Sequence, residues 1–96
     1  MLVLITYDVA VTSSGGAKRL RRVAKECKNY GLRVQYSVFE CNVDAAQLEL
    51  FKNKLINIID QEQDSIRFYI LGNNYKTKVE HYGGKKVIDI SDPLIL

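Results

Sequence analysis

The first eight residues constrain the fold of this chain most. Met1–Asp8 is a run of apolar and β-branched residues closed by a carboxylate, which favours a β-strand. Because the run lacks the alternation of a half-exposed strand, we expect both of its faces to be buried in a sheet. Side chains alternate along a strand, so Tyr7 and Asp8 should point to opposite faces. Asp8 is then either a turn residue or part of a site.

Two amphipathic helices are expected from the apolar spacing. The first covers residues 17–30, with Gly31 ending it in the left-handed conformation. The second begins at Asp44, whose side chain can form a capping box with Gln47. The apolar face of the first helix consists of Leu20, Val23, Ala24, Cys27 and Tyr30. That of the second consists of Leu48, Phe51, Leu55, Ile58 and Ile59.

The remaining apolar segments favour strands. Leu32–Val43 can form one bent strand or two short ones, with a bulge or tight turn near Gln35–Ser37. Ile66–Leu71 is a further strand and Val87–Ile90 a last short one. The order predicts one α+β domain over residues 1–96, in the ferredoxin-like βαββαβ pattern with an additional C-terminal β-strand.

This topology leaves one face of the sheet without a cover. Both helices should lie on the same face, yet the first strand and Ile66–Leu71 are apolar on both faces. A second copy of the chain is the simplest cover, so we predict a two-fold homodimer packed sheet to sheet. In that dimer Asp8 would approach its symmetry mate. Two carboxylates with water ligands suffice to hold Mg²⁺.

The formal net charge of +3 is unevenly distributed along the chain. Residues 18–33 hold seven Lys or Arg residues against Glu26 alone, and residues 72–86 hold four Lys residues against Glu80. Such concentration favours a polyanionic partner such as nucleic acid, although a basic helix face can equally be a solvated surface.

The composition suggests a cytoplasmic protein without a membrane segment, because neither a signal peptide nor a long apolar span is apparent. Cys27 and Cys41 suit a reducing compartment, and Cys27 should be buried on its helix. We expect His81 to be a surface residue. The Ser-Ser-Gly-Gly loop that ends at Gly16 favours a connector over a phosphate-binding loop, because it lacks the Walker spacing.

Four segments together resemble the Cas2 family of CRISPR-associated proteins over nearly the whole chain. They are Leu4–Asp8, the cations within residues 19–25, Tyr30–Glu40 and Asp64–Tyr69. The most specific is the run Gly-x-Arg-Val-Gln-x-Ser-Val-Phe-Glu. The resemblance implies a ferredoxin-like homodimer with a hairpin inside Arg33–Glu40, and a C-terminal strand and tail that pair with the partner protomer.

The resemblance also implies function. Members are described as Mg²⁺-dependent endonucleases on RNA or double-stranded DNA, and as the DNA-bridging partner of the Cas1 integrase in spacer acquisition. Asp8 matches the metal aspartate of the family and is the expected catalytic residue and Mg²⁺ ligand. The expected nucleic-acid-binding residues are Lys18, Arg19, Arg22, Lys25 and Arg33, and the expected supporting residues are Tyr7, Ser37 and Phe39.

Three functional hypotheses follow. In the first, Mg²⁺ between two Asp8 carboxylates polarises a phosphoryl oxygen and activates a bound water for hydrolysis. In the second, the basic helix grips a duplex backbone without cleaving it. The third, a reader of single-stranded RNA, is disfavoured because the Ser37–Cys41 strand lacks the glycine of such motifs and a dimer would hide the sheet.

Overall fold

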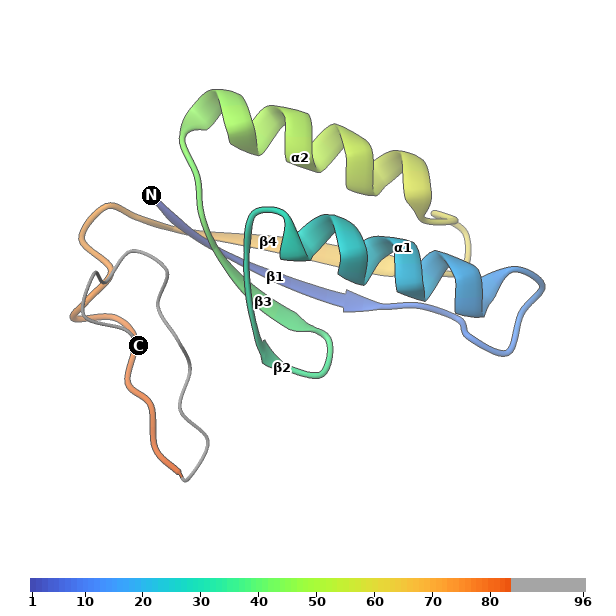
Figure 1. Cartoon of the computed structure of the whole chain (residues 1–96), viewed down its shortest axis with the longest axis horizontal. Coiled ribbons are helices and arrows are strands. Elements are labelled where there is room, and N and C mark those ends of the chain that lie inside the picture. The colour runs from blue at the N-terminus through green and yellow to red at the C-terminus, as the bar shows by residue number, and fades with distance from the viewer. Residues whose placement is uncertain (84–96) are drawn as a thin grey trace.

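The computed structural model describes residues 1–83, which form a four-stranded antiparallel sheet with two helices on one face (Figure 1). The elements are β1 (Leu2–Asp8), α1 (Gly16–Lys28), β2 (Gly31–Gln35), β3 (Val38–Asn42), α2 (Ala45–Ile58) and β4 (Ser65–Gly72). The strand order is β2-β3-β1-β4, so each helix connects two strands that are not neighbours. The ferredoxin-like prediction is confirmed. The expected strand Val87–Ile90 and the apolar tail lie outside the described residues.

The strand β1 pairs with β3 on one side and β4 on the other, and its side chains on one face contribute to the core. Ile5 lies opposite Phe39 of β3 and Phe68 of β4, on the face that the helices cover. Val3 and Ile5 are fully buried, and Tyr7 is nearly so. The helices meet this face with the apolar residues that their spacing predicted, of which Val23, Cys27, Phe51 and Leu55 are fully buried. The core therefore lies between this face of the sheet and the two helices.

The opposite face of the sheet is not covered by any helix of residues 1–83. On β1, Leu4 and Thr6 are partly exposed and Asp8 is exposed. Tyr69, which lies opposite Leu4 on β4, is 41% exposed. Burial of both faces of β1 is thus incomplete in a single chain. The sheet-to-sheet homodimer stays a prediction.

The segment after α1 forms two short strands rather than one bent strand. β2 and β3 pair around a turn at Tyr36 and Ser37, with a register shift between Arg33 and Gln35. Gly31 does not end α1 in the left-handed conformation, so that prediction is wrong: Asn29 is the right-handed C-cap, and Gly31 begins β2. Its lack of a side chain serves another purpose. A Cβ there would lie 2.1 Å from the Glu40 carbonyl oxygen on β3.

The start of α1 depends on two glycines rather than on a serine cap. Gly15 is the N-cap in the left-handed conformation (φ 76°), and no side chain caps the helix. A Cβ on Gly16 would lie 2.1 Å from the Ala10 carbonyl oxygen, so the loop can fold back only over a glycine. The Ser13 hydroxyl donates to the same Ala10 oxygen at 2.6 Å, which turns the loop locally.

The second helix begins as expected. The Asp44 carboxylate accepts from the Gln47 N–H at 2.7 Å, and the Gln47 side chain accepts from the Asp44 N–H at 3.0 Å. Phe51 stacks on Tyr30 with ring centroids 4.4 Å apart and meets Phe68 edge-on. These contacts hold α2 against β4 and against the turn that follows α1. Across residues 1–83, neither helix has the length and apolar character to cross a bilayer.

Candidate functional site

Asp8 is the last residue of β1 and projects from the uncovered face of the sheet. It lies opposite Ser65, the first residue of β4, and its side chain is exposed while Tyr7 is buried on the other face. The carboxylate borders a shallow depression of about 360 Å³, lined by Thr6, Tyr7, Asp8, Ser65, Arg67 and Tyr69. The prediction that Asp8 and Tyr7 point to opposite faces is therefore confirmed.

Arg67 is a cation of this depression that the sequence did not assign to the site. It lies opposite Thr6 on β4, on the same face as Asp8. Its Nη1 donates to the Tyr69 hydroxyl at 3.1 Å, which raises the pKa of the guanidinium. The signal available in the sequence was one charge inside the apolar strand Ile66–Leu71. Arg67 is the one cation of β4, and it lies close to the end of β1.

The depression offers hard oxygen ligands but few of them. Asp8 is its only carboxylate, and residues 1–83 contain no cluster of three or more His, Cys, Asp or Glu side chains. Mg²⁺ is commonly bound by one or two carboxylates and keeps several waters, which an exposed carboxylate permits. The residues fit Mg²⁺ if a second chain brings its own Asp8 to the same ion.

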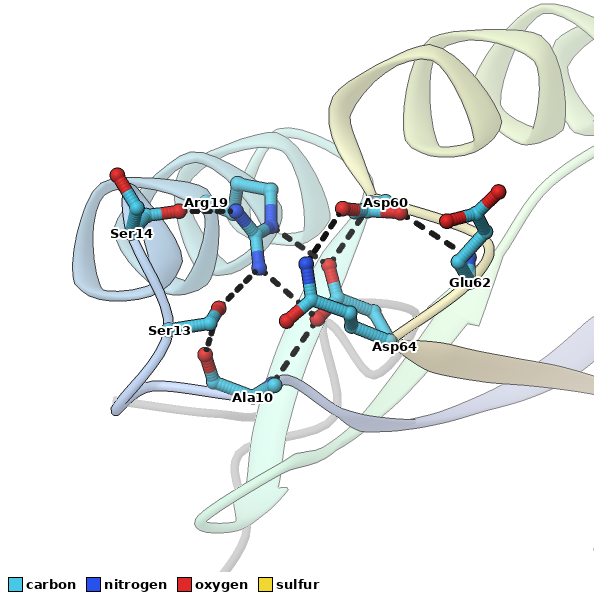
Figure 2. A network of polar contacts seen from close by, with 8 residues as sticks. Ala10, Ser13, Ser14, Arg19, Asp60, Glu62 and Asp64 are labelled. Carbon is cyan, nitrogen blue, oxygen red and sulfur yellow. Dashed lines mark hydrogen bonds and ion pairs between the residues drawn. The ribbon is translucent and has the colours of Figure 1, made fainter.

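The Asp64 carboxylate is buried and accepts four hydrogen bonds (Figure 2). Its Oδ1 accepts from the Ala10 N–H at 2.9 Å and from Arg19 Nη2 at 3.3 Å. Its Oδ2 accepts from Arg19 Nε and from the Asp60 N–H, both at 2.8 Å. The Arg19 guanidinium, helped by the two backbone N–H groups, lowers the pKa of Asp64 to about 2. Asp64 therefore stays ionised although its side chain is fully buried.

Arg19 is engaged throughout in this network. Besides Asp64, its Nη1 donates to the Ser14 carbonyl oxygen at 3.0 Å and its Nη2 to the Ser13 hydroxyl at 2.9 Å. Only 15% of its side chain is exposed. The phosphate-binding role predicted for Arg19 stays a prediction, and within this chain all three of its guanidinium nitrogens donate to protein oxygens. Nothing local in the sequence marks Asp64 as the partner of Arg19, because 45 residues separate the two.

The remaining predicted cations lie elsewhere. Lys18, Arg22 and Lys25 are exposed on α1 and form no ion pair within residues 1–83. Arg33 lies on β2 with its guanidinium 5.2 Å from the centre of the Phe39 ring, on the helix-covered side of the sheet. One chain therefore does not bring these cations to the face that carries Asp8.

The three supporting residues meet beneath the end of β1. The Tyr7 ring stacks on Phe39 with centroids 6.2 Å apart, and the Tyr7 N–H donates to the Ser37 carbonyl oxygen at 3.1 Å. Burial raises the pKa of Tyr7. Phe39 is fully buried, so it supports the strand and has no surface to offer a ligand.

The two thiols and the histidine take the places expected of them. Cys27 and Cys41 are both free and fully buried. Burial raises the pKa of each thiol to about 12, so neither forms a nucleophilic thiolate near neutral pH. His81 is exposed.

Comparison with known proteins agrees with this architecture. Residues 1–79 match the family described as CRISPR associated protein Cas2. The chain is 66% identical over 95 residues to the CRISPR-associated endonuclease Cas2 of Halalkalibacterium halodurans, covering 99% of both chains. It is 56% identical over 96 residues to the CRISPR-associated endoribonuclease Cas2 of Nitratidesulfovibrio vulgaris, covering 100% of this chain and 94% of that one.

Comparison with solved structures points to the same family. The crystal structure of Streptococcus pyogenes Cas2 at pH 6.5 superimposes with a TM-score of 0.76 at 54% identity, and the match covers 86% of this chain and 100% of that one. Family model, sequence relatives and fold therefore coincide. The chain belongs to the CRISPR associated protein Cas2 family.

Proposed function

We propose that this chain is a Mg²⁺-dependent endonuclease that hydrolyses phosphodiester bonds of double-stranded DNA or RNA. The observation that supports this most is the exposed Asp8 carboxylate at the end of β1, beside the Arg67 guanidinium, in a chain of the Cas2 family. Relatives at 66% and 56% identity are named endonuclease and endoribonuclease, which supports nuclease chemistry and leaves both nucleic acids as substrates.

Asp8 is the proposed catalytic residue and metal ligand. Mg²⁺ bound by Asp8 and by Asp8 of a second copy would polarise a phosphoryl oxygen and lower the pKa of a bound water. Arg67 lies on the same face and can donate two parallel hydrogen bonds to phosphate oxygens, because its guanidinium is a planar fork. Its bond to Tyr69 holds that fork against the sheet.

The homodimer belongs to this proposal because one chain supplies one carboxylate. The uncovered face around Asp8 carries partly exposed apolar groups, including Leu4 and Tyr69, which a second copy would bury. A two-fold axis through this face would bring the two Asp8 side chains together. It would also double the basic helices that are available to a nucleic acid.

Nucleic-acid binding is assigned to the exposed cations Lys18, Arg22, Lys25 and Arg33. They would bind phosphates, and phosphate contacts position a nucleic acid without reading its sequence. Replacing one phosphate-binding cation by a neutral residue should make the slope of log K against log salt shallower by about 0.9 for a duplex.

A second candidate function is a non-catalytic DNA bridge that acts with the Cas1 integrase in spacer acquisition. The exposed basic surface of α1, which lies apart from Asp8, favours it, since binding there does not need the carboxylate. The two functions are compatible in one protein.

The deciding experiment compares wild type with Asp8→Asn on labelled RNA and labelled duplex DNA, with Mg²⁺ or with EDTA. Glu49→Gln, which neutralises an exposed carboxylate on α2, is the matched control. With Mg²⁺ present, we expect Asp8→Asn to cleave no faster than wild type does in EDTA, and to keep the duplex affinity of wild type. The control Glu49→Gln should cleave as fast as wild type. Full Mg²⁺-dependent cleavage by Asp8→Asn would refute the catalytic proposal. If wild type bound nucleic acid but did not cleave it, the non-catalytic DNA bridge would be the supported function.

A further inference from the structure

The Asp64 carboxylate ties together three segments that are distant in the sequence. Through Arg19 it holds the first turn of α1, through the Ala10 N–H the loop after β1, and through the Asp60 N–H the turn before β4 (Figure 2). The carboxylate is fully buried and all four bonds are 3.3 Å or shorter.

These anchor points lie on both sides of Asp8. Asp64 directly precedes Ser65, which is the ladder partner of Asp8. Ala10 follows Asp8 by two residues, where the chain has left the sheet. The end of β1 and the start of β4 are therefore held by one carboxylate at the position where their pairing stops. Strand ends without such an anchor fray readily.

The identity of the cation also matters. Arg19 uses Nε, Nη1 and Nη2 to reach Asp64, the Ser14 carbonyl oxygen and the Ser13 hydroxyl. The Ser13 hydroxyl in turn donates to Ala10. A lysine keeps the charge but is a single point donor and cannot bridge three oxygens in one plane.

We propose that the Arg19–Asp64 ion pair is a positioning element that fixes Asp8 for Mg²⁺ binding and phosphodiester hydrolysis. This inference rests on the proposed function. Neither residue touches substrate in it: both act through the backbone of residues 8–10 and 64–65. Disruption of the pair loosens the end of β1, so that Asp8 spends less time where it can hold the metal.

A direct phosphate contact by Arg19 is the competing explanation, and charge separates the two. If Arg19 bound phosphate, removal of the neighbouring Asp64 charge would strengthen nucleic-acid binding, and Arg19→Lys would keep much of it. If the pair positions Asp8, the same defect is expected in Arg19→Lys, which keeps its charge, and in Asp64→Asn, which loses its charge. Both lower turnover while nucleic-acid affinity is kept.

The test measures cleavage rate, duplex affinity and metal binding for wild type, Arg19→Lys, Asp64→Asn and the control Glu49→Gln, which loosens an exposed ion pair on α2. We expect both pair variants to lose about tenfold to a hundredfold in kcat, the scale of a small misplacement of a reacting group. Their duplex Kd should stay within about twofold, because affinity comes from phosphate contacts elsewhere.

Metal binding gives a readout that does not need turnover. Mn²⁺, a paramagnetic probe, should broaden the amide signals of Asp8 and Ser65 in wild type at lower concentration than in either pair variant. Circular dichroism at the assay temperature confirms that each variant is folded. Arg19→Lys keeps the charge and is the milder change if Asp64→Asn is unfolded.

Normal kcat and normal Mn²⁺ broadening in both folded variants would overturn the inference. So would opposite shifts in duplex affinity, which would identify Arg19 as a phosphate contact. If wild type does not cleave at all, the proposed function fails, but weaker Mn²⁺ broadening in the pair variants would still show that they position Asp8.

Discussion

Asp64→Asn should destabilise the fold far more than an ordinary surface substitution. The asparagine keeps the shape but turns an NH₂ group toward the Arg19 guanidinium or toward a backbone N–H, since all four partners of Asp64 are donors. Neutralising one partner of a buried ion pair leaves the other charge uncompensated and typically costs about 3–5 kcal/mol. Because Arg19 retains 15% exposure, we expect the lower end, roughly 3 kcal/mol.

The pH dependence of this difference follows from the pKa of Asp64. Its pKa is lowered from an ordinary 3.8 to about 2, so the folded state favours the ionised form. The resulting stability is fully present above the unfolded pKa and is lost as the pH falls from about 4 to about 2. The gap in unfolding free energy between wild type and Asp64→Asn should therefore be constant from about pH 7 to about pH 5 and shrink below about pH 4.

Urea unfolding followed by circular dichroism measures this gap. With a slope of about 1–2 kcal/mol per molar urea, a decrease of roughly 3 kcal/mol lowers the midpoint by about 2 M. Protein concentration must be equal throughout, since a dimer couples stability to concentration. The exposed pair variant Glu49→Gln should change the unfolding free energy by less than about 0.5 kcal/mol. The reasoning would be refuted if the difference in unfolding free energy between wild type and Asp64→Asn were the same near neutral pH and below about pH 3. That result would mean that folding does not lower the pKa of Asp64.

Three further predictions concern the backbone, the thiols and the dimer. Gly31→Ala should lower the thermal midpoint sharply, because its Cβ would lie 2.1 Å from the Glu40 carbonyl oxygen and the strands would have to separate; an unchanged midpoint would contradict this. Cys27 and Cys41 should not react with an aromatic disulfide reagent in the native protein at about pH 8 and should react fully in urea; rapid native labelling would show that they are accessible. Equal mixing and exchange of wild-type and Asp8→Asn chains should leave about a quarter of the wild-type cleavage rate if two Asp8 side chains share one metal, and about half if each acts alone.

Much of the fold could be predicted because it depends on periodic burial. The apolar stripes of residues 17–30 and of α2 identified the faces that pack on the sheet, and Val23, Cys27 and Phe51 are fully buried as expected. The capping box from Asp44 to Gln47 is a local signal that spans four residues, and it was predicted correctly. The sequence left the choice between one strand and two open in Leu32–Val43, since no glycine-containing turn marks residues 36 and 37.

The structural roles of Gly31 and Arg19 depend on contacts between distant segments. Gly31 follows a helix, which is the usual place of a left-handed glycine, but its role is to let β3 approach. Arg19 lies among other cations on a basic helix, yet its partner is 45 residues away. No periodicity or spacing distinguishes it from Arg22, which is exposed three residues later. The sequence showed Arg67 only as the one charged residue within the apolar strand Ile66–Leu71, which did not indicate a role in the site.

The geometry of a single chain explains why the sheet face matters for function. Asp8 and Arg67 lie on the uncovered face, whereas the exposed cations of α1 lie beyond the covered one. A nucleic acid that lay flat on the basic helix of one chain would not reach the carboxylate of that chain through the sheet. Binding and cleavage can therefore be impaired separately, so a variant that binds duplex DNA normally and does not cleave it is expected rather than anomalous. If substitution of an exposed cation of α1 lowered kcat at saturating nucleic acid without unfolding the chain, the separation of the two surfaces would be wrong.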